Sequence, residues 1–481
     1  MDTLKTLIQQ KIERSQNWFF SQQNPDGHWR AELEGDALLQ GELIIILAFL
    51  GLENTPLAKR LANQLIKTQA EDGGWPMFTG GKSTIPNTVK AYFALKLTGH
   101  PLSAEYMQRA RRCVLRMGGA DKVNSFTRFY LAILGQVPYS QCPAVPPEMI
   151  LLPKWAPINL YSISSWTRTI VVPLSIVSAL QPVREIPVEK GIRELFIKKP
   201  EDWGPLRAPG KPENPGFFSW DMFFRAIDRV MKAYQKFPLK PTRKIALKWS
   251  EEWLWEHCQN SDGPGAIQPP IMWGLVAMKA LGRSDDDERT RYFWDQLMNL
   301  VIDCPEEDTA RCEPCLSPVW DTIITMRALA AGGLRAGDER VDRAINWVLD
   351  HQIHVPGDWS KSVKCKPCMW CFEYHNDFYP DTDDTAMSIM ALRGMVPERG
   401  VNPRLDDAVD GALKWLRAMQ NSDGGWGAFD RNNNKEFLTQ VPFADHNAMT
   451  DPSTPDLTSR ILECFGTLGF RVGQGDKNLD R

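Results

Sequence analysis

The stretch Gln420-Asn-Ser-Asp-Gly424-Gly425-Trp426 decides the fold, because related stretches recur along the chain. In each copy an amphipathic helix ends, a Gly suits the left-handed turn, the Gln amide can bond free backbone groups, and the Trp covers the turn. A single unit of this kind cannot bury its own apolar face, so the units must pack side by side. The other copies begin at Gln23, Gln69 and Gln352 (ending at Trp359), with one that lacks the Trp at Gln259.

The repeats predict an all-α fold of helix hairpins, which either close into α/α barrels or stack as an open solenoid. Strand-type alternation is almost absent. At 481 residues the chain is long enough for two domains with sizeable cores. We predict an N-terminal helix over residues 1–20, a first domain over 21–304 and a second over 305–481, divided at the polar run that starts at Pro305.

Composition and apolar patterning restrict the partners. The 56 basic and 59 acidic residues give a net charge of −3, which provides no footprint for nucleic acid. No secretion signal follows Met1, and the longest apolar run, Leu43 to Leu50, is too short to span a bilayer. We therefore expect a cytosolic protein or one that lies on a membrane face. The Pro-rich stretch Val137 to Trp166 is expected either to touch a membrane, or line an entrance, or to pack as a surface loop.

The ten cysteines are interpreted as thiols rather than disulfides. Cys312-x2-Cys315 and Cys365-x2-Cys368 imitate a zinc or iron–sulfur ligand set. The two pairs are far apart in sequence and lack the compact spacing of a zinc finger, so we expect no metal.

The stretch Tyr379-Pro380-Asp381-Thr382-Asp383-Asp384-Thr385 places three carboxylates at the start of a predicted helix, and it allows two interpretations. Acids at a helix N-terminus act as caps, and the helix dipole lowers their pKa. Alternatively, acids this close together cannot all ionise away from water. Burial would then raise the pKa of one of them, which would hold its proton near neutral pH and act as a proton donor.

Together, the Gln–Trp repeats and Asp381-x-Asp383-Asp384 resemble the squalene–hopene cyclases, within the class II terpene cyclases. The likeness covers nearly the whole chain. It extends to Ser164-Ser165-Trp166, Pro264 to Pro269, Ser317-Pro318-Val319-Trp320-Asp321-Thr322, Trp370-Cys-Phe372-Glu-Tyr374, Trp426 to Asp430, and Asp451-Pro452 with Asp456.

The resemblance implies two α/α barrels with a large apolar cavity between them, no cofactor and no metal. It implies cyclisation of squalene to hopene or hopanol, and attachment to one leaflet of the bacterial cytoplasmic membrane, on its cytoplasmic face. A homodimer is left open.

The resemblance also implies roles for residues in the matching segments. Asp383 would be the proton donor, hydrogen-bonded to its neighbours, with Asp381 and Asp384 tuning it and Arg460 pairing with one carboxylate. Asp451 and Asp456 would form a polar shell around the acid. The residues expected to contact the substrate or stabilise cations are Trp166, Trp320, Phe372, Phe429, Gln268 and Ile267.

Two departures from the family pattern are expected to matter. Relatives continue beyond Arg481 through further Gln–Trp repeats, so we expect the second barrel to be incomplete and this polypeptide alone to be unstable or inactive. His446 stands where some relatives have an aromatic residue.

Other functions remain open at this stage. A class II cyclase of a shorter prenyl diphosphate would need a basic pocket, and no Lys/Arg cluster stands near the aromatic segments in the sequence. An inactive truncated cyclase would act only as an α/α-barrel binding module. Prenyltransferase subunits share the barrel but need zinc.

Overall fold

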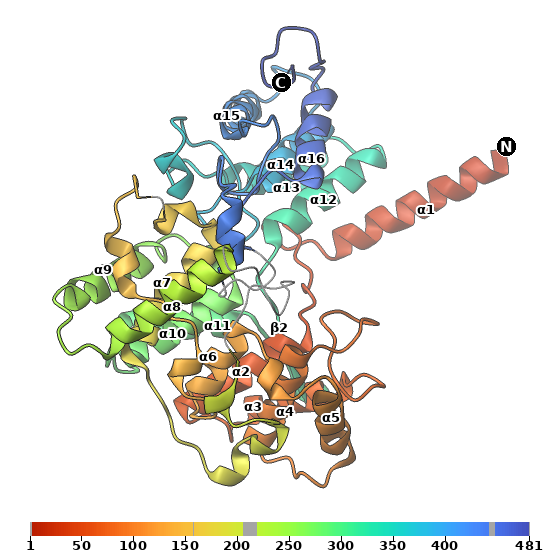
Figure 1. Ribbon diagram of the computed structural model, residues 1–481. Helices are drawn as coiled ribbons and strands as arrows, with labels where there is room; N and C mark the ends of the chain where they lie inside the picture. Colours follow the sequence, from red (N-terminus) through yellow and green to blue (C-terminus); the bar gives the residue numbers. More distant parts are fainter. Residues whose placement is uncertain (1, 157, 205–218, 442–447, 481) are drawn as a thin grey trace.

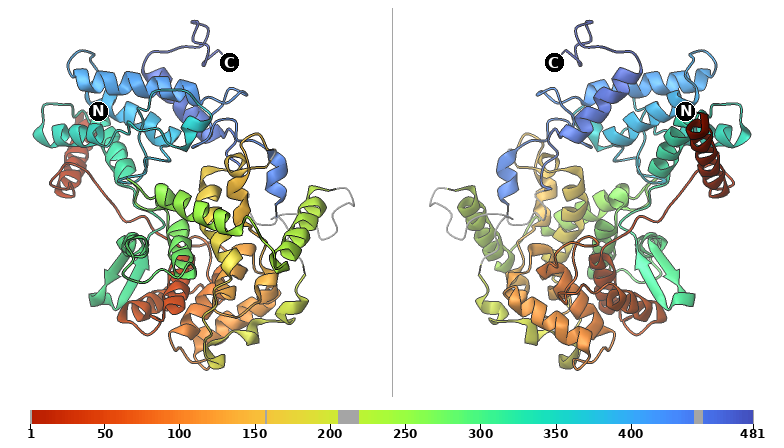
Figure 2. Two further views of the ribbon diagram at one scale, coloured as in Figure 1. Left: turned by 90° about the vertical axis from the view of Figure 1, so that its left-hand side faces the viewer. Right: turned by 90° about the vertical axis from the view of Figure 1, so that its right-hand side faces the viewer.

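The computed structural model describes residues 2–156, 158–204, 219–441 and 448–480. His446 and most of the connection over residues 199–218 lie outside these ranges. The described chain forms two helical lobes, and the N-terminal helix α1 (Asp2–Ser21) projects from the second lobe, which it contacts through Gln16 and Phe19 (Figure 1). The two side views in Figure 2 show the same two lobes. The second lobe is drawn mainly in the blue colours of the C-terminal residues.

The first lobe is built from ten helices in the described residues. They are α2 (Ala37–Leu50), α3 (Pro56–Lys67), α4 (Ile85–Leu97), α5 (Glu105–Arg116), α6 (Ser125–Ala132), α7 (Ser165–Leu180), α8 (Trp220–Lys236), α9 (Arg243–Glu256), α10 (Gln268–Ala280) and α11 (Glu288–Asn299).

The second lobe follows a short β-hairpin of β1 (Val301–Cys304) and β2 (Thr309–Cys312). Its helices are α12 (Pro318–Ala331), α13 (Glu339–Asp350), α14 (Thr382–Met395), α15 (Pro403–Met419) and α16 (Pro455–Thr467). The hairpin occupies the position where the polar run predicted only a domain boundary. Four-residue strands are too short for the alternation of apolar and polar residues to reveal them.

The helices form two classes, as expected for hairpins packed in two layers. Helices α2, α4, α7, α10 and α14 are buried on nearly all sides and apolar all round. Helices α3, α5, α13 and α15 bury a single stripe, which in α5 is Met107, Ala110, Cys113 and Val114. The first class therefore forms the inner layer of each lobe and the second class the outer layer.

Each lobe has its own apolar core. One cluster of buried residues runs from Leu39 to Cys312, and the other from Val319 to Phe465. Two short segments cross over: Trp29 packs in the second cluster, and Leu438 and Met449 pack in the first.

The Gln–Trp units have the predicted anatomy. The Gln69 amide donates to the carbonyls of Gly73 (2.9 Å) and Tyr106 (2.8 Å), and the Trp75 indole donates to the Leu65 carbonyl at 2.8 Å. Gly73 adopts φ +90°, and a Cβ there would lie 2.7 Å from the Arg109 carbonyl oxygen. The turn therefore requires glycine, both for its left-handed backbone and for the close approach of α5.

The Trp of each unit also fixes the next inner helix. The backbone N–H of Trp75 donates to the Thr88 hydroxyl at the start of α4. Three further pairs repeat this contact at α12, α14 and α16, at 3.0–3.2 Å: Trp29 with Thr322, Trp370 with Thr385, and Trp426 with Thr458.

The same contact shows that the Trp predicted for the fourth unit was wrong. The predicted copy ended at Trp359, but the Trp359 indole nitrogen has no hydrogen-bond partner in the described structure, and Gly357 is not left-handed. Trp370 takes the structural role, because its indole donates to the Val348 carbonyl at 2.7 Å. The loop between the helix end and the Trp is longer here than in the other units, so the spacing in the sequence pointed to the wrong Trp.

The Pro-rich stretch between Val137 and Trp166 packs in part against the first lobe, and its contact with a membrane or an entrance stays a prediction. It forms short 3-10 turns, including Pro147–Leu151, and Met149 and Ile150 pack against the first core. Trp155, by contrast, is 85% exposed. No helix in the described part of the chain is long and apolar enough to cross a bilayer.

Candidate active site

The three carboxylates begin helix α14, and one of them is its cap. Asp381 is the N-cap residue, and its Oδ1 accepts from the Asp384 backbone N–H at 2.6 Å. The capping interpretation therefore accounts for Asp381. Asp383 and Asp384 lie in the first turn, where the dipole alone would lower their pKa.

Arg460 reaches the acids because α14 and α16 are fixed by the same contact. The Thr385 hydroxyl accepts from the Trp370 N–H, and the Thr458 hydroxyl accepts from the Trp426 N–H. Asp383 lies two residues before Thr385, and Arg460 lies two residues after Thr458. Helix α16 packs beside α14, and an Arg460 Nη1 lies 3.0 Å from Asp383 Oδ2. This is the only side-chain hydrogen bond of Asp383 among the described residues, and its Oδ1 is buried without a partner. The expectation that the Asp383 side chain bonds to its neighbouring acids was therefore wrong.

Burial reverses the effect of the helix dipole on all three acids. It raises the pKa of Asp383, and the Asp456 charge raises it further, while the Arg460 guanidinium opposes both. Burial also raises the pKa of Asp381 to about 6. The pKa of Asp384 lies well above its usual range because of burial and the adjacent Asp381 carboxyl, with which it shares a hydrogen bond. The cluster therefore favours the protonated form of its carboxyls more than an exposed helix N-terminus would.

Aromatic rings lie beside Arg460 and on α7. The Arg460 guanidinium carbon lies 5.4 Å from the centre of the Trp320 ring. Trp320 stacks with Phe372 at 6.1 Å between ring centres, and Trp166 of α7 contacts Phe429 at 5.5 Å. The four rings therefore form two pairs, of which the first is linked to Asp383 through Arg460.

The two shell residues are placed differently. Asp451 is buried and accepts the backbone N–H groups of Ala428, Phe429 and Asp430 at 2.7–2.9 Å. This loop in turn holds Thr382 at the start of α14, through the Ala428 and Gly427 carbonyls. Asp456 is exposed, but its charge acts on Asp383.

An apolar cavity of about 380 Å³ lies on the first-lobe side. Trp166 and Ile267 are among its walls. Gln268 is not: it is fully buried, and its amide donates to the Leu39 carbonyl (3.1 Å) and to the Cys312 sulfur (3.3 Å). Gln268 therefore fixes the start of α10 beside the cavity and lies outside it.

The same cavity has a buried ion pair in its wall that the sequence argument missed. Lys90 Nζ lies 2.5 Å from a Glu42 oxygen, and the Tyr130 hydroxyl donates to the other oxygen at 3.0 Å. Charged residues within the otherwise apolar helices α2 and α4 were the available signal, because a charge buried in an inner helix needs a partner.

A second buried network, also missed, joins the two lobes. Arg168 of α7 bridges Asp358 and Asp430 at 2.7 Å each. Asp358 also accepts from the Tyr379 hydroxyl at 3.0 Å. Tyr379 lies two residues before Asp381 in the sequence. Burial alone would raise the pKa of Asp358, but His257, Arg168 and Lys361 hold it far below its usual range. Arg168 thus fixes both segments that flank the acids.

The cysteines are free thiols, and Cys371 lies near the acids: burial raises its pKa, and the Glu373, Asp384 and Asp381 charges raise it further. The Cys312 sulfur is buried against Gln268, and Cys368 packs against the Ala408 carbonyl. Within the described ranges, no group of three or more Cys, His, Asp or Glu side chains is arranged to hold a metal ion.

The fold and site define a class: an α/α-barrel protein with a cluster of buried carboxyls of raised pKa, paired with an arginine that lies over an aromatic ring. Family models agree over most of the chain. The squalene-hopene cyclase N-terminal domain matches residues 12–306, and the squalene-hopene cyclase C-terminal domain matches residues 316–479.

Individual relatives give the same answer. The chain is 36% identical to a squalene-hopene cyclase of Schizosaccharomyces japonicus, over 96% of this chain and 71% of the relative. It is 37% identical to one of Bradyrhizobium diazoefficiens, over 96% and 70%. A weak structural likeness links it to abietadiene synthase from Abies grandis, with a TM-score of 0.39 and 15% identity, over 88% of this chain and 43% of that one. The chain belongs to the squalene-hopene cyclase family of terpene cyclases.

Proposed function

We propose that this protein cyclises squalene, or a closely related polyprenoid, by protonating a terminal alkene. The observation that carries the proposal is the Asp381, Asp383 and Asp384 cluster, with Arg460 bound to Asp383 and lying over Trp320. An alkene is a very weak base, so its protonation requires a strong acid in a dry, fixed site.

Asp383 is the proposed donor. Burial keeps its proton in place, and Arg460 stabilises the carboxylate that remains after transfer, which strengthens the acid. The proton forms a new C–H bond with the alkene, and the positive charge moves to the neighbouring carbon. Asp384, protonated beside Asp381, keeps a second negative charge from forming next to the donor.

The aromatic pairs stabilise the moving cation. Trp320, stacked on Phe372, is linked to Asp383 through Arg460, and we propose that Trp166 and Phe429 act at a later stage of the cyclisation. Ring faces attract a cation without reacting as strong nucleophiles. Ring closure ends with loss of a proton to water or capture of water, and Ile267, in the wall of the cavity, is proposed to contact the late cation. Gln268 supports that wall from behind.

The direct test is gas chromatography of lipid products after incubation of the purified chain with squalene in detergent. Cyclic C30 products from the native chain, and none from Asp383→Asn, would support the proposal and would show that the expectation of an unstable or inactive polypeptide was wrong. Equal product from both would contradict the role of Asp383, and absence of cyclic product from a folded native chain would contradict the activity.

We also propose contact with one membrane leaflet. The support is a group of exposed apolar side chains on α8, α9 and the segment between them: Trp220, Phe223, Val230, Phe237, Leu239 and Trp249. Such a group, with basic residues along α8, suits an interface that is apolar inside and charged at its surface. Phe223→Ser with Val230→Ser should reduce co-sedimentation with phosphatidylcholine vesicles, whereas Val188→Ser with Val401→Ser should not.

The domain boundary near residues 304 and 305 is kept as a proposal. It is supported by the separation of the two cores between Cys312 and Val319. Limited proteolysis that cuts first within residues 305–308 and leaves two stable fragments would support it.

A further inference from the structure

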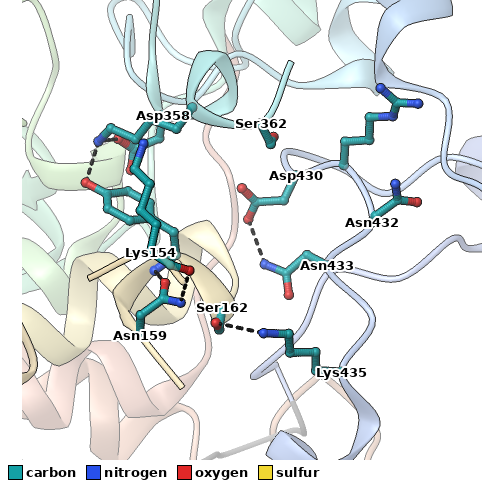
Figure 3. A pocket seen from close by; sticks show the side chains of 12 residues that line it. Lys154, Asn159, Ser162, Asp358, Ser362, Asp430, Asn432, Asn433 and Lys435 are labelled. Carbon is teal, nitrogen blue, oxygen red and sulfur yellow. Dashed lines mark hydrogen bonds and ion pairs between the residues drawn. The ribbon is translucent and has the colours of Figure 1, made fainter. Parts of the chain in front are cut away.

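A polar pocket lies where three distant segments of the chain meet (Figure 3). The segments are residues 154–162 before α7, residues 358–362 before α14, and residues 430–435 after the last Gln–Trp unit. The pocket has a volume of about 190 Å³, room for several waters or one small polyatomic ion. Because the three segments belong to both lobes, the pocket lies at the junction of the lobes, which is a common place for ligand sites.

Positive charge exceeds negative charge in the walls of this junction pocket. Lys154, Lys361, Arg431 and Lys435 line it, against the two carboxylates Asp358 and Asp430. The buried Arg168 lies 2.7 Å from both carboxylates. Lys361 adds a second cation to Asp358, at 2.6 Å. These two cations balance the two carboxylates, so Lys154 and Arg431 add positive charge to the pocket.

Lys154, Lys361 and Lys435 are exposed, but each makes a specific contact that holds it at the pocket. Lys154 and Lys361 lie over the Tyr161 ring, at 5.6 and 4.0 Å from its centre. Lys435 Nζ donates to the Ser162 hydroxyl at 3.1 Å. Arg431 is anchored by its Nε, which donates to the Gln420 carbonyl at 2.9 Å, and this leaves its two Nη groups for other contacts. Neutral donors join them in the wall, from Asn432 and Ser362.

We propose that the junction pocket binds a phosphate-type anion, either free phosphate or diphosphate or the phosphate of a lipid headgroup. Phosphate oxygens accept several charge-assisted hydrogen bonds at once, which matches lysine and arginine donors arranged around one small volume. Cyclisation of a neutral polyene does not require this positive charge, so the proposed anion site has a role separate from the cyclisation reaction. Its position predicts that the anion ties residues 154–162 to residues 430–435, next to the acid-bearing loop.

The first test is binding of inorganic pyrophosphate to the full chain by calorimetry, with sodium chloride at equal ionic strength as reference. We expect saturable binding at one site and a melting temperature that rises with pyrophosphate concentration, because a ligand of the native state stabilises it. Lys154→Gln with Lys435→Gln should weaken binding about tenfold or more, since two charge-assisted contacts are lost.

The matched control is Lys59→Gln with Lys122→Gln, which removes the same charge from exposed positions elsewhere on the first lobe. Binding that does not saturate, or that both double variants weaken equally, would overturn the proposal, because it would then be a general charge effect. Melting curves without ligand show whether each variant is folded.

A second arm identifies the source of the phosphate. Vesicles of phosphatidylcholine are compared with vesicles that also contain phosphatidic acid. If phosphatidic acid strengthens vesicle binding, and Lys154→Gln with Lys435→Gln or added pyrophosphate abolishes that gain, the site accepts a lipid headgroup. If pyrophosphate binds in solution but vesicle binding is indifferent to phosphatidic acid, the ligand is a free phosphate.

Discussion

Asp383 and Asp456 occupy the same place in successive helical units, yet their surroundings differ. Asp383 lies two residues before Thr385 of α14, and Asp456 lies two residues before Thr458 of α16. The hydroxyl of each Thr accepts the backbone N–H of the Trp in a Gln–Trp unit. The pKa of Asp383 is raised by burial, whereas that of the exposed Asp456 is lowered by hydrogen bonding at the helix start. The repeat therefore sets the position of an acid, and the packing around it sets its proton affinity.

Neutralising the two acids should give the largest contrast. Asp383→Asn removes the proposed donor, and general acid catalysis contributes roughly 10²–10⁴-fold to rate. Asp456→Asn removes only a nearby charge and should leave most of the activity. Initial rates of cyclic product formation decide the matter, and comparable losses in the two variants would show that the repeat position, not burial, selects the acid.

The two arginines extend the comparison to the partners of the acids. Arg168→Met leaves the buried Asp358 and Asp430 without their shared cation, and loss of one member of a buried pair costs about 3–5 kcal/mol. Arg460→Met breaks a pair that is partly exposed, so it should cost far less stability. Urea unfolding of both variants measures this. Arg168→Lys should recover part of the loss, and an Arg168→Met variant as stable as the native chain would exclude the bridge between the lobes.

A smaller effect is expected in the pH dependence of stability. The folded-state pKa of Asp384 lies above its unfolded value of about 3.8, so the fold favours its protonated form. This contribution is fully present below the unfolded pKa and is lost as pH rises toward the folded pKa, at up to about 1.4 kcal/mol per pH unit. Asp384→Asn should flatten the fall in stability above pH ~4. Asp456→Asn, at an acid whose pKa is lowered, should not, and identical pH profiles for Asp384→Asn and the native chain would refute the shift.

The smallest expected effect distinguishes the true repeat Trp from its neighbour. Trp370→Phe loses the indole hydrogen bond to Val348 and leaves that carbonyl unpaired, at a cost of about 1–2 kcal/mol. Trp359 has no such bond in the described structure, so Trp359→Phe should cost less. Chemical denaturation of the two variants provides the measurement, and a greater loss for Trp359→Phe would restore the original reading of the fourth repeat.

The sequence predicted the local features well. Glutamine, glycine and tryptophan at fixed spacing specify a turn whose hydrogen bonds lie within one unit, and Gly73, Gln69 and Trp75 form it as expected. The fourth unit failed because its loop is longer and contains two tryptophans. A pair between Arg460 and one of the three carboxylates was also expected, from the family resemblance, and the threonine contacts explain why Arg460 lies against Asp383.

Features that depend on several segments were not predictable. The Glu42 and Lys90 pair, the Arg168 bridge and the basic junction pocket each join residues that are dozens to hundreds of positions apart. No Lys/Arg cluster stands near the aromatic segments in the sequence, but in the folded chain the junction pocket gathers basic side chains from three separate segments. Charged residues within apolar helices signalled that partners exist, but not which ones.

The sequence by itself determined the repeating unit, the all-α class and the identity of the acid-bearing helix, because each depends on hydrogen bonds and apolar spacing within a few tens of residues. Only the tertiary structure determined which carboxyls have a raised pKa and which charged side chains lie close to one another. Those properties depend on burial and on charge separations of a few ångströms, which arise only when the two lobes pack together.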